Sequence, residues 1–375
     1  MVSAGRPRRT TDVFIVGGGP AGLAAGIAAR EQGLDVMVAD GAPPPIDKVG
    51  GEGVTPNGVE ALRSLGVEIR RHDAVSVRGI RFIVSGLRAE ATFAGEPGCG
   101  IRRTTLHRLL VERAAAVGVR LHWQTRVLGL IPGGVLSDAG PVACRWIVGA
   151  DGERSQVRRW VGLTPARPPV QRFGYRRHFR VTPWTDLIEV HWCRGAQVFV
   201  TPVSAGEVCV ALISRDPRVR LRSLIEVCPN LARRLGQAPA STPEWGAISA
   251  ARRLPAVTRG SVALIGEASG SVDTTTGEGL SPIFQHALVL ADALRAGDLR
   301  SYEASHRRIL CTPAFMAGLL LAMDRSPWLR RRALRAFTVE PGLFSRLLAL
   351  HVDRFTPPRR AVGSFCTLGW RLLTA

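Results

Sequence analysis

The sequence predicts an α/β fold: a mostly parallel sheet flanked by helices, interleaved with an antiparallel sheet and followed by a C-terminal helical segment. A β-branched run at residues 12–16 leads through a glycine-rich turn into an alanine-rich stretch, which is the order strand, turn, helix. Segments with period-two alternation, separated by Pro, Gly and Ser, occupy residues 173–213 and indicate antiparallel strands. From about residue 311 onward the pattern is helical.

The composition is that of a globular protein with enough apolar residues for a core. Of 375 residues, 46% are hydrophobic and 21% are charged, which excludes a disordered or collagen-like chain. The formal net charge is +20, carried by 49 Arg and a single Lys. Because the chain is also rich in Ala, Gly and Pro, codon drift explains part of this basicity. No basic stretch interleaves with aromatic residues in a nucleic-acid-binding motif, so no nucleic-acid partner is predicted.

The cysteines and the apolar runs indicate in which cellular compartment the protein is expected. The cysteines are odd in number, scattered and never spaced as C-x-x-C, so neither a disulfide framework nor a metal site is predicted. An apolar stretch after Arg6, Arg8 and Arg9 resembles a secretory signal, but it contains a glycine-rich turn that fits a nucleotide-binding motif better. The apolar run 314–323 is too short to span a bilayer. A cytoplasmic location is predicted. The cysteines are Cys99, Cys144, Cys193, Cys209, Cys228, Cys311 and Cys366.

The opening segment has the spacing of a Rossmann-type dinucleotide-binding turn. Gly17, Gly19 and Gly22 give G-x-G-x-x-G: one glycine for the turn, one for close approach of a pyrophosphate, and one for helix–strand packing. The phosphates would lie at the helix N-terminus, where free N–H groups and the positive end of the dipole face them. Asp40 ends the next strand, where it is placed to accept hydrogen bonds from a ribose diol.

Two further strand ends carry an acid and glycines. Residues 146–150 run into Asp151 and Gly152, and residues 262–266 run into Glu267, a Thr/Gly loop and a helix from about residue 281. With the opening turn, these segments resemble the three motifs of the para-hydroxybenzoate hydroxylase-like FAD family, which includes aromatic monooxygenases, geranylgeranyl reductases and halogenases. The resemblance covers most of residues 10–310 and implies FAD as the cofactor.

The resemblance also implies roles for single residues. Glu267 would hydrogen-bond the ribityl chain, although the family usually has Gly-Asp where this chain has Gly-Glu. Gly277 and Gly279 would let backbone N–H groups approach the flavin pyrimidine edge, where the following helix N-terminus stabilises negative charge. Arg103, at the start of a predicted helix, would reach the cofactor, with an ordinary solvated arginine as the alternative.

The loop 47–53 points to one branch of the family. It resembles the D-K-x-C-G-E-G loop of geranylgeranyl-reductase-like flavoproteins, with Gly50 where that group commonly carries Cys. Lys48 is the only lysine of the chain, which codon drift does not explain. Its compact ammonium group would contact a phosphate or the flavin face, unless it is a plain surface lysine.

The predicted domains follow these motifs. The first part of the FAD-binding domain spans residues 10–165, with a possible excursion to the substrate domain near 80–100; the antiparallel substrate domain spans 166–254, the second FAD part 255–310, and a basic helical segment 311–375. His191, Trp192 and Phe199 would line a pocket for a hydrophobic substrate, or simply form the core of the sheet. No catalytic residue is assigned.

The C-terminal segment is strongly basic. From Arg325 onward ten Arg face only Glu340 and Asp353, a net charge of +8, and large apolar residues punctuate the run. Such a segment would rest on an anionic membrane, or would be a helix that caps the flavin domain.

The sequence favours a flavin monooxygenase that hydroxylates or epoxidises an apolar or aromatic molecule through a flavin C4a-hydroperoxide, as the family implies. Reduction of prenyl double bonds by the same flavin is the alternative, and an inactive flavin-binding module is the third. Residues 197–202 lack the W-x-W-x-I-P motif of the halogenases. Because there is no second G-x-G-x-x-G, NAD(P)H would bind only transiently as electron donor.

Overall fold

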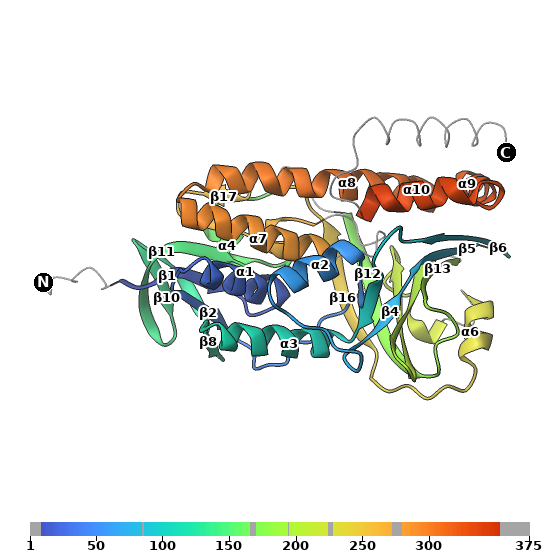
Figure 1. Cartoon of the computed structure of the whole chain (residues 1–375), viewed down its shortest axis with the longest axis horizontal. Coiled ribbons are helices and arrows are strands. Elements are labelled where there is room, and N and C mark those ends of the chain that lie inside the picture. Colours follow the sequence, from blue (N-terminus) through green and yellow to red (C-terminus); the bar gives the residue numbers. More distant parts are fainter. Residues whose placement is uncertain are drawn as a thin grey trace, which may run out of the picture.

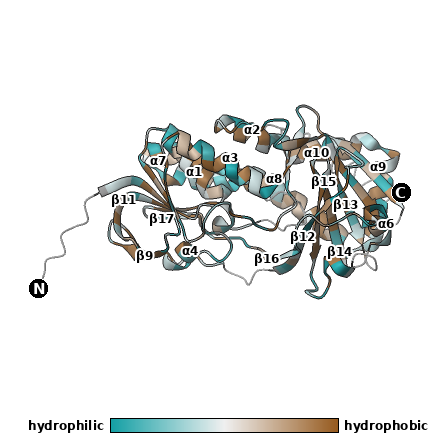
Figure 2. Ribbon diagram, turned by 90° about the horizontal axis from the view of Figure 1, so that it is seen from below, coloured by the Kyte–Doolittle hydropathy of each residue, from teal (hydrophilic) through white to brown (hydrophobic). Residues whose placement is uncertain are grey.

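The computed structural model describes residues 9–84, 86–165, 170–193, 195–223, 228–271 and 280–352. Two sheets lie side by side along the long axis of the molecule, and the helix α8 (Leu299–Arg325) runs over both (Figure 1). Hydrophobic segments follow the strands of both sheets (Figure 2). The predicted α/β class is confirmed. After the prediction from the sequence, we call the part built on the sheet with β1 the nucleotide-binding half and the part built on the sheet with β12 the substrate half.

The nucleotide-binding half is built on a sheet in the order β17-β18-β11-β1-β2-β8, with β10 and β9 beside β11. The pairs from β18 to β8 are parallel, and β17, β10 and β9 join antiparallel. The helix α1 follows β1 and is buried over its first ten residues, because it packs between the sheet and the helices α3 and α7. The bounds are β1 Arg9–Val16, α1 Pro20–Glu31, β2 Val36–Asp40, α3 Arg103–Ala116, β8 Arg120–Trp123, β9 Val127–Ile131, β10 Gly134–Ser137, β11 Gly140–Gly149, α4 Gln156–Trp160, β17 Thr258–Arg259, β18 Val262–Leu264 and α7 Ser281–Ala296.

The substrate half is a seven-stranded sheet in the order β16-β12-β15-β14-β13-β5-β6. Its neighbours are antiparallel except β13 and β5, which are parallel. The strands β5 and β6 come from the first third of the chain, so this sheet is assembled from two distant segments. A small sheet β3-β7-β4 connects the halves. The bounds are β3 Gly53–Val54, α2 Pro56–Ser64, β4 Ala74–Val77, β5 Gly79–Val84, β6 Leu87–Thr92, β7 Gly98–Ile101, β12 Val170–Arg180, β13 Leu187–Cys193, β14 Ala196–Ser204, β15 Glu207–Ser214 and β16 Trp245–Ala251.

The C-terminal helices cover one face of the substrate sheet. The helices α9 (Pro327–Val339) and α10 (Pro341–Val352) lie against β5 and β6 (Figure 1). Leu334 of α9 and Phe344 of α10 share a core with Phe82 and Trp192 of the sheet. Within the described ranges, no single helix is long and apolar enough to cross a membrane, and α8 with α9 passes that test only as a pair bent by 118°.

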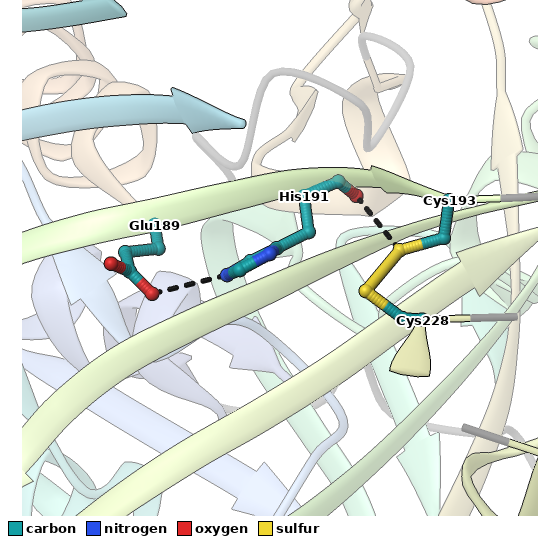
Figure 3. The surroundings of a disulfide bond; sticks show 4 residues. All are labelled: Glu189, His191, Cys193 and Cys228. Carbon is teal, nitrogen blue, oxygen red and sulfur yellow. Dashed lines mark hydrogen bonds and ion pairs between the residues drawn. A yellow bond between two sulfur atoms is a disulfide. The ribbon is translucent and has the colours of Figure 1, made fainter. Parts of the chain in front are cut away.

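A disulfide joins Cys193, at the end of β13, to Cys228, which precedes α6 (Pro229–Leu235); the two Cα atoms lie 5.3 Å apart (Figure 3). The prediction from the sequence that cysteines form no disulfide is therefore wrong for this pair. The two residues are separated by 35 positions, so no short motif marks them, and they meet only because α6 packs against this face of the sheet.

Next to the disulfide, Glu189 is fully buried on the same face of β13 (Figure 3). Its carboxylate accepts hydrogen bonds from Arg81 at 2.9 Å and from Trp184 at 3.1 Å, and it pairs with His191 at 3.1 Å. Burial alone would raise the pKa of Glu189, but these partners outweigh it and lower the pKa to about 2.

We expect Glu189→Gln to reduce the free energy of unfolding near pH 7 by roughly 2–3 kcal/mol, because a pKa lowered in the folded state stabilises the fold when the group is ionised. The wild-type contribution is complete above the unfolded pKa near 4.5 and is lost as the pH falls toward 2. Urea unfolding at several pH values measures it. Glu90→Gln is the matched control, since Glu90 pairs with the same Arg81 but is half exposed, so it should cost less than about 1 kcal/mol. Equal losses for the two variants would contradict the prediction.

Candidate cofactor site

A cavity of about 490 Å³ lies between the two halves. The carboxyl ends of β1, β2 and β11 form one wall, as expected for a ligand site in an open parallel sheet. The loop 46–53 forms a second wall, and the near ends of β12, β15 and β16 form a third. A ligand in this cavity would therefore touch both halves.

The glycine turn after β1 leaves room for a ligand at one position only. A Cβ on Gly22 would lie 1.8 Å from the Gly17 carbonyl oxygen, and one on Gly17, which has φ +111°, would lie 2.5 Å from the Ala150 oxygen. A Cβ on Gly19 would meet nothing within 4 Å. Gly19 precedes α1, whose N-terminus has no side-chain cap and lines the cavity. The first N–H groups of α1 thus face open space suited to phosphate groups.

The two aspartates lie on either side of this turn. Asp40 accepts hydrogen bonds from the N–H groups of Gly18 at 2.7 Å and Ala42 at 2.8 Å. Asp151 Oδ2 accepts from Gln156 N–H at 2.7 Å at the start of α4, while its Oδ1 is buried without a partner. Both residues line the cavity, so Asp151 has a carboxylate oxygen left for a ligand hydroxyl.

Lys48 and Glu267 form an ion pair across the cavity wall. Lys48 comes from the loop after β2, and Glu267 comes from the turn Gly266–Ser269 after β18. Glutamate in place of the family's aspartate thus extends toward Lys48. The Lys48 Nζ also lies 3.4 Å from where a Cβ on Gly152 would stand, so Lys48 also lies beside the turn that follows β11.

Arg103 is the first residue of α3 and lines the cavity, whereas its neighbour Arg102 pairs with Glu207 at 2.6 Å. Burial lowers the pKa of Arg103, against the opposing attraction of Glu267 and Glu52. Its Nε has no hydrogen-bond partner. Of the predicted cofactor residues, Gly17, Gly19, Asp40, Lys48, Arg103, Asp151 and Glu267 line one cavity, Gly22 packs the turn behind it, and Gly277 and Gly279 lie outside the described residues.

The sequence did not reveal a buried ion cluster behind the cavity wall. Glu52, with φ +59°, accepts hydrogen bonds from the Arg176 guanidinium at 2.9 Å and the Arg103 N–H at 3.0 Å, and pairs with His178 Nε2 at 2.6 Å. Asp47 binds Arg176 through both oxygens. Burial alone would raise the pKa of Asp47, but Arg176 lowers it overall. This cluster holds the loop 47–53 onto β12. Glu52 belongs to the loop 47–53, which the sequence singled out, but no local pattern pairs it with residues more than 120 positions away.

The same cluster brings together three side chains of metal-ligand type. Atoms of Glu52, His178 and Cys209 lie within 4.8 Å of one another and all three residues are buried. Because Arg176 already binds one Glu52 oxygen and Arg103 lies nearby, a cation added here would meet two guanidinium groups. Glu52 and Asp47 already have cationic partners, so their charges are balanced by side chains.

A second, smaller cavity of about 70 Å³ adjoins the first and shares Gly51, Gly53 and Phe199 with it. Its wall is formed by the substrate sheet and by the inner faces of α8, α9 and α10. Of the three predicted pocket residues Phe199 lines both cavities, whereas His191 turns to Glu189 on the other face and Trp192 packs against Phe82. The lining side chains are apolar apart from two threonines: Thr55, Ile80, Phe82, Ile188, Val190, Phe199, Thr201, Met316, Leu319, Leu320, Met323, Phe337, Phe344, Leu347 and Leu348.

Comparison with known proteins agrees with this geometry. Residues 10–297 match the family described as FAD binding domain. The chain belongs to this family. It is 31% identical over 328 residues to a menaquinone reductase of Mycobacterium tuberculosis, covering 77% of this chain and 78% of the relative. It is 35% identical over 174 residues to a digeranylgeranylglycerophospholipid reductase of Methanosarcina mazei, 42% of each chain.

The fold also matches a solved flavoprotein/dehydrogenase from Cytophaga hutchinsonii with a TM-score of 0.83 at 16% identity, over 97% of this chain and 99% of that one. The predicted resemblance is thereby confirmed, and the protein is an FAD-dependent oxidoreductase. The residues present fit the cofactor: an uncapped helix N-terminus beside the open face of Gly19, and an unpartnered carboxylate oxygen of Asp151. Residues 17–21, Asp151 and Glu267 would hold FAD, and the loop 47–53 forms another wall of the same cavity.

We expect Gly19→Val to bind FAD at least tenfold more weakly while remaining folded. The added side chain enters the open space that the phosphates need, and its Cβ meets no protein atom within 4 Å. The visible absorption spectrum of the purified protein and its thermal unfolding by circular dichroism measure the two effects. Gly22→Ala is the contrasting variant, since its Cβ would clash with the Gly17 carbonyl and should lower both stability and flavin content. Normal flavin content in Gly19→Val would move the phosphates away from this turn.

Proposed function

We propose that this enzyme is a reductase that uses FAD to saturate a carbon–carbon double bond of an isoprenoid chain. The observation that carries the proposal is the apolar cavity that adjoins the cofactor cavity at the glycine loop. A flexible hydrocarbon chain needs a narrow apolar passage and no polar partners, and this cavity is lined in that way.

The connection between the two cavities supports a particular orientation. Gly51 and Gly53 belong to both walls, so an apolar chain under the C-terminal helices would have its reacting end at this loop. Phe199 also belongs to both walls and would contact the substrate there. The loop is held by the buried Glu52 cluster, so its backbone forms a fixed edge against which a double bond can be oriented.

The relatives support the same reaction class. The two relatives described above are named as reductases of menaquinone and of a digeranylgeranyl lipid, and each name denotes a molecule with isoprenoid chains. The loop 47–53, which favours the geranylgeranyl-reductase branch, lies at the point where the two cavities meet.

The proposed reduction requires few catalytic side chains, because the cofactor supplies the reactive group. Bound FAD supplies hydride transfer, and the protein supplies binding, orientation and exclusion of water. The double bond takes up one hydride and one proton, so the product gains two hydrogen atoms and the cofactor is oxidised. We further propose NAD(P)H in the cytoplasm as the transient donor that reduces the cofactor again.

Hydroxylation, which the sequence favours, uses the same cofactor but requires O₂. The apolar lining of the second cavity offers few polar partners to hold an aromatic substrate in one orientation, which is why we place reduction first.

We expect the purified enzyme, reduced by dithionite or NAD(P)H under argon, to convert a polyprenyl quinone or geranylgeranyl lipid to a product two hydrogen atoms heavier by mass spectrometry. A reductase needs no O₂, whereas a monooxygenase stops without it. Product formation that requires air, with gain of an oxygen atom, would overturn the proposal in favour of hydroxylation. If no donor reduces the bound flavin, neither reduction nor hydroxylation can be the activity of this protein.

We expect Met316→Trp, which adds bulk to the wall of the apolar cavity from α8, to raise KM for a long-chain isoprenoid at least tenfold and to leave a substrate with one prenyl unit unchanged. Met316 is only partly buried, so the larger ring does not have to be forced into the core. Steady-state kinetics with the two chain lengths measure the ratio. Equal effects on both substrates would show that the chain does not occupy this cavity.

A further inference from the structure

The outer face of α9 carries a continuous stripe of basic and apolar residues. Trp328, Arg331, Arg332, Arg335 and Val339 follow the spacing i, i+3, i+4, i+7, i+11, which places them on one side of a helix. Trp328 and Val339, at the two ends, are 60% and 68% exposed, the two highest values among the exposed large apolar residues that the structure describes. The opposite side, with Ala333, Leu334, Ala336 and Phe337, is buried against the substrate sheet.

The charge of this stripe is not neutralised within the described part of the chain. The helix contains four arginines and no acid, and none of the three stripe arginines has an ion pair with a described residue. The acids that bracket α9 are occupied: Asp324 pairs with Arg172 and Arg215 on the substrate half, and Glu340 pairs with Arg346. The Arg332 guanidinium lies over the Trp328 ring, 4.8 Å from its centroid.

We propose that this stripe docks the enzyme on an anionic phospholipid bilayer. Arginines spaced along one side of a helix match anionic headgroups, and an exposed Trp and Val beside them can enter the interface, where Trp is favoured. A nucleic acid would satisfy the charges but would leave Val339 exposed. The bilayer is therefore the partner that the composition of the stripe fits best.

The position of the stripe gives the docking a purpose, which rests on the proposed function. Phe337, on the inner side of the same helix, lines the apolar cavity together with residues of α8 and α10. Docking through α9 would hold the helices that wall this cavity against the membrane that contains an isoprenoid substrate. The sequence predicted a membrane contact for the whole basic C-terminal segment, and this proposal assigns the contact to the outer face of α9.

Co-sedimentation of the full-length holoenzyme with vesicles tests the docking directly. We expect binding to phosphatidylcholine vesicles that contain phosphatidylglycerol, little binding to phosphatidylcholine alone, and weakening by salt. The double variant R331E/R335E should bind the anionic vesicles at least about 30-fold more weakly, since each arginine near the surface contributes about 1 kcal/mol. R63E/R300E, the same charge change at exposed positions on α2 and at the start of α8, should bind nearly as the wild type does.

A second measurement locates the contact. Brominated phospholipid should quench the tryptophan fluorescence of the wild type, and Trp328→Phe should lose most of that quenching, whereas Trp245→Phe, which removes a half-exposed tryptophan of the substrate sheet, should keep it. Unchanged binding by R331E/R335E, an equal loss in R63E/R300E, or tighter binding to duplex DNA than to the anionic vesicles would overturn the docking surface. Turnover of a short, water-soluble prenyl substrate is expected to be equal in R331E/R335E and wild type, and its absence in both would count against the proposed reaction alone.

Discussion

The buried carboxylate of Glu52 is the interaction on which the shape of the cavity depends. It binds the N-terminus of α3 through Arg103 N–H and the strand β12 through Arg176 and His178. Breaking a buried pair leaves an uncompensated charge at a cost of several kcal/mol. The loop 47–53, α3 and β12 are therefore held together as one unit, and the nucleotide half cannot move away from the substrate sheet at this point without exposing that charge.

Glycines complete this junction because the substrate strands approach their Cα atoms too closely for a side chain. A Cβ on Gly53 would lie 2.6 Å from Ile188 Cδ1, and one on Gly100 would lie 1.8 Å from the Pro202 carbonyl oxygen. The small sheet that contains both glycines thus contacts the substrate strands directly, which brings the cofactor cavity and the apolar cavity to a common wall at Gly51 and Gly53. The ion cluster supplies the attraction, and the glycines set the distance.

This division also explains what the sequence could predict. The turn at Gly17–Gly22 and the strand-end acids are local features, because they follow from spacing within a few residues. Most of the residues that line the cavity there could therefore be named in advance. Glu52 and His178 are 126 positions apart, β5 joins β13 across about 100 residues, and Cys193 meets Cys228 only through α6. Such contacts leave no periodic pattern in one sequence, because each depends on how complete elements pack.

The C-terminal helices show how one element can serve both the interior and the surface. Three of the four arginines of α9 lie on its outer side, and the fourth, Arg330, is partly buried. Because burial disfavours a charged side chain, the outer position of those three carries no information by itself. The absence of any acid among them, and the exposure of Trp328 and Val339 beside them, are not required by burial. Codon drift toward arginine would not place a tryptophan and a valine in the same row. The composition of this face therefore needs a partner that is both anionic and apolar at its boundary, and a phospholipid headgroup region has both properties.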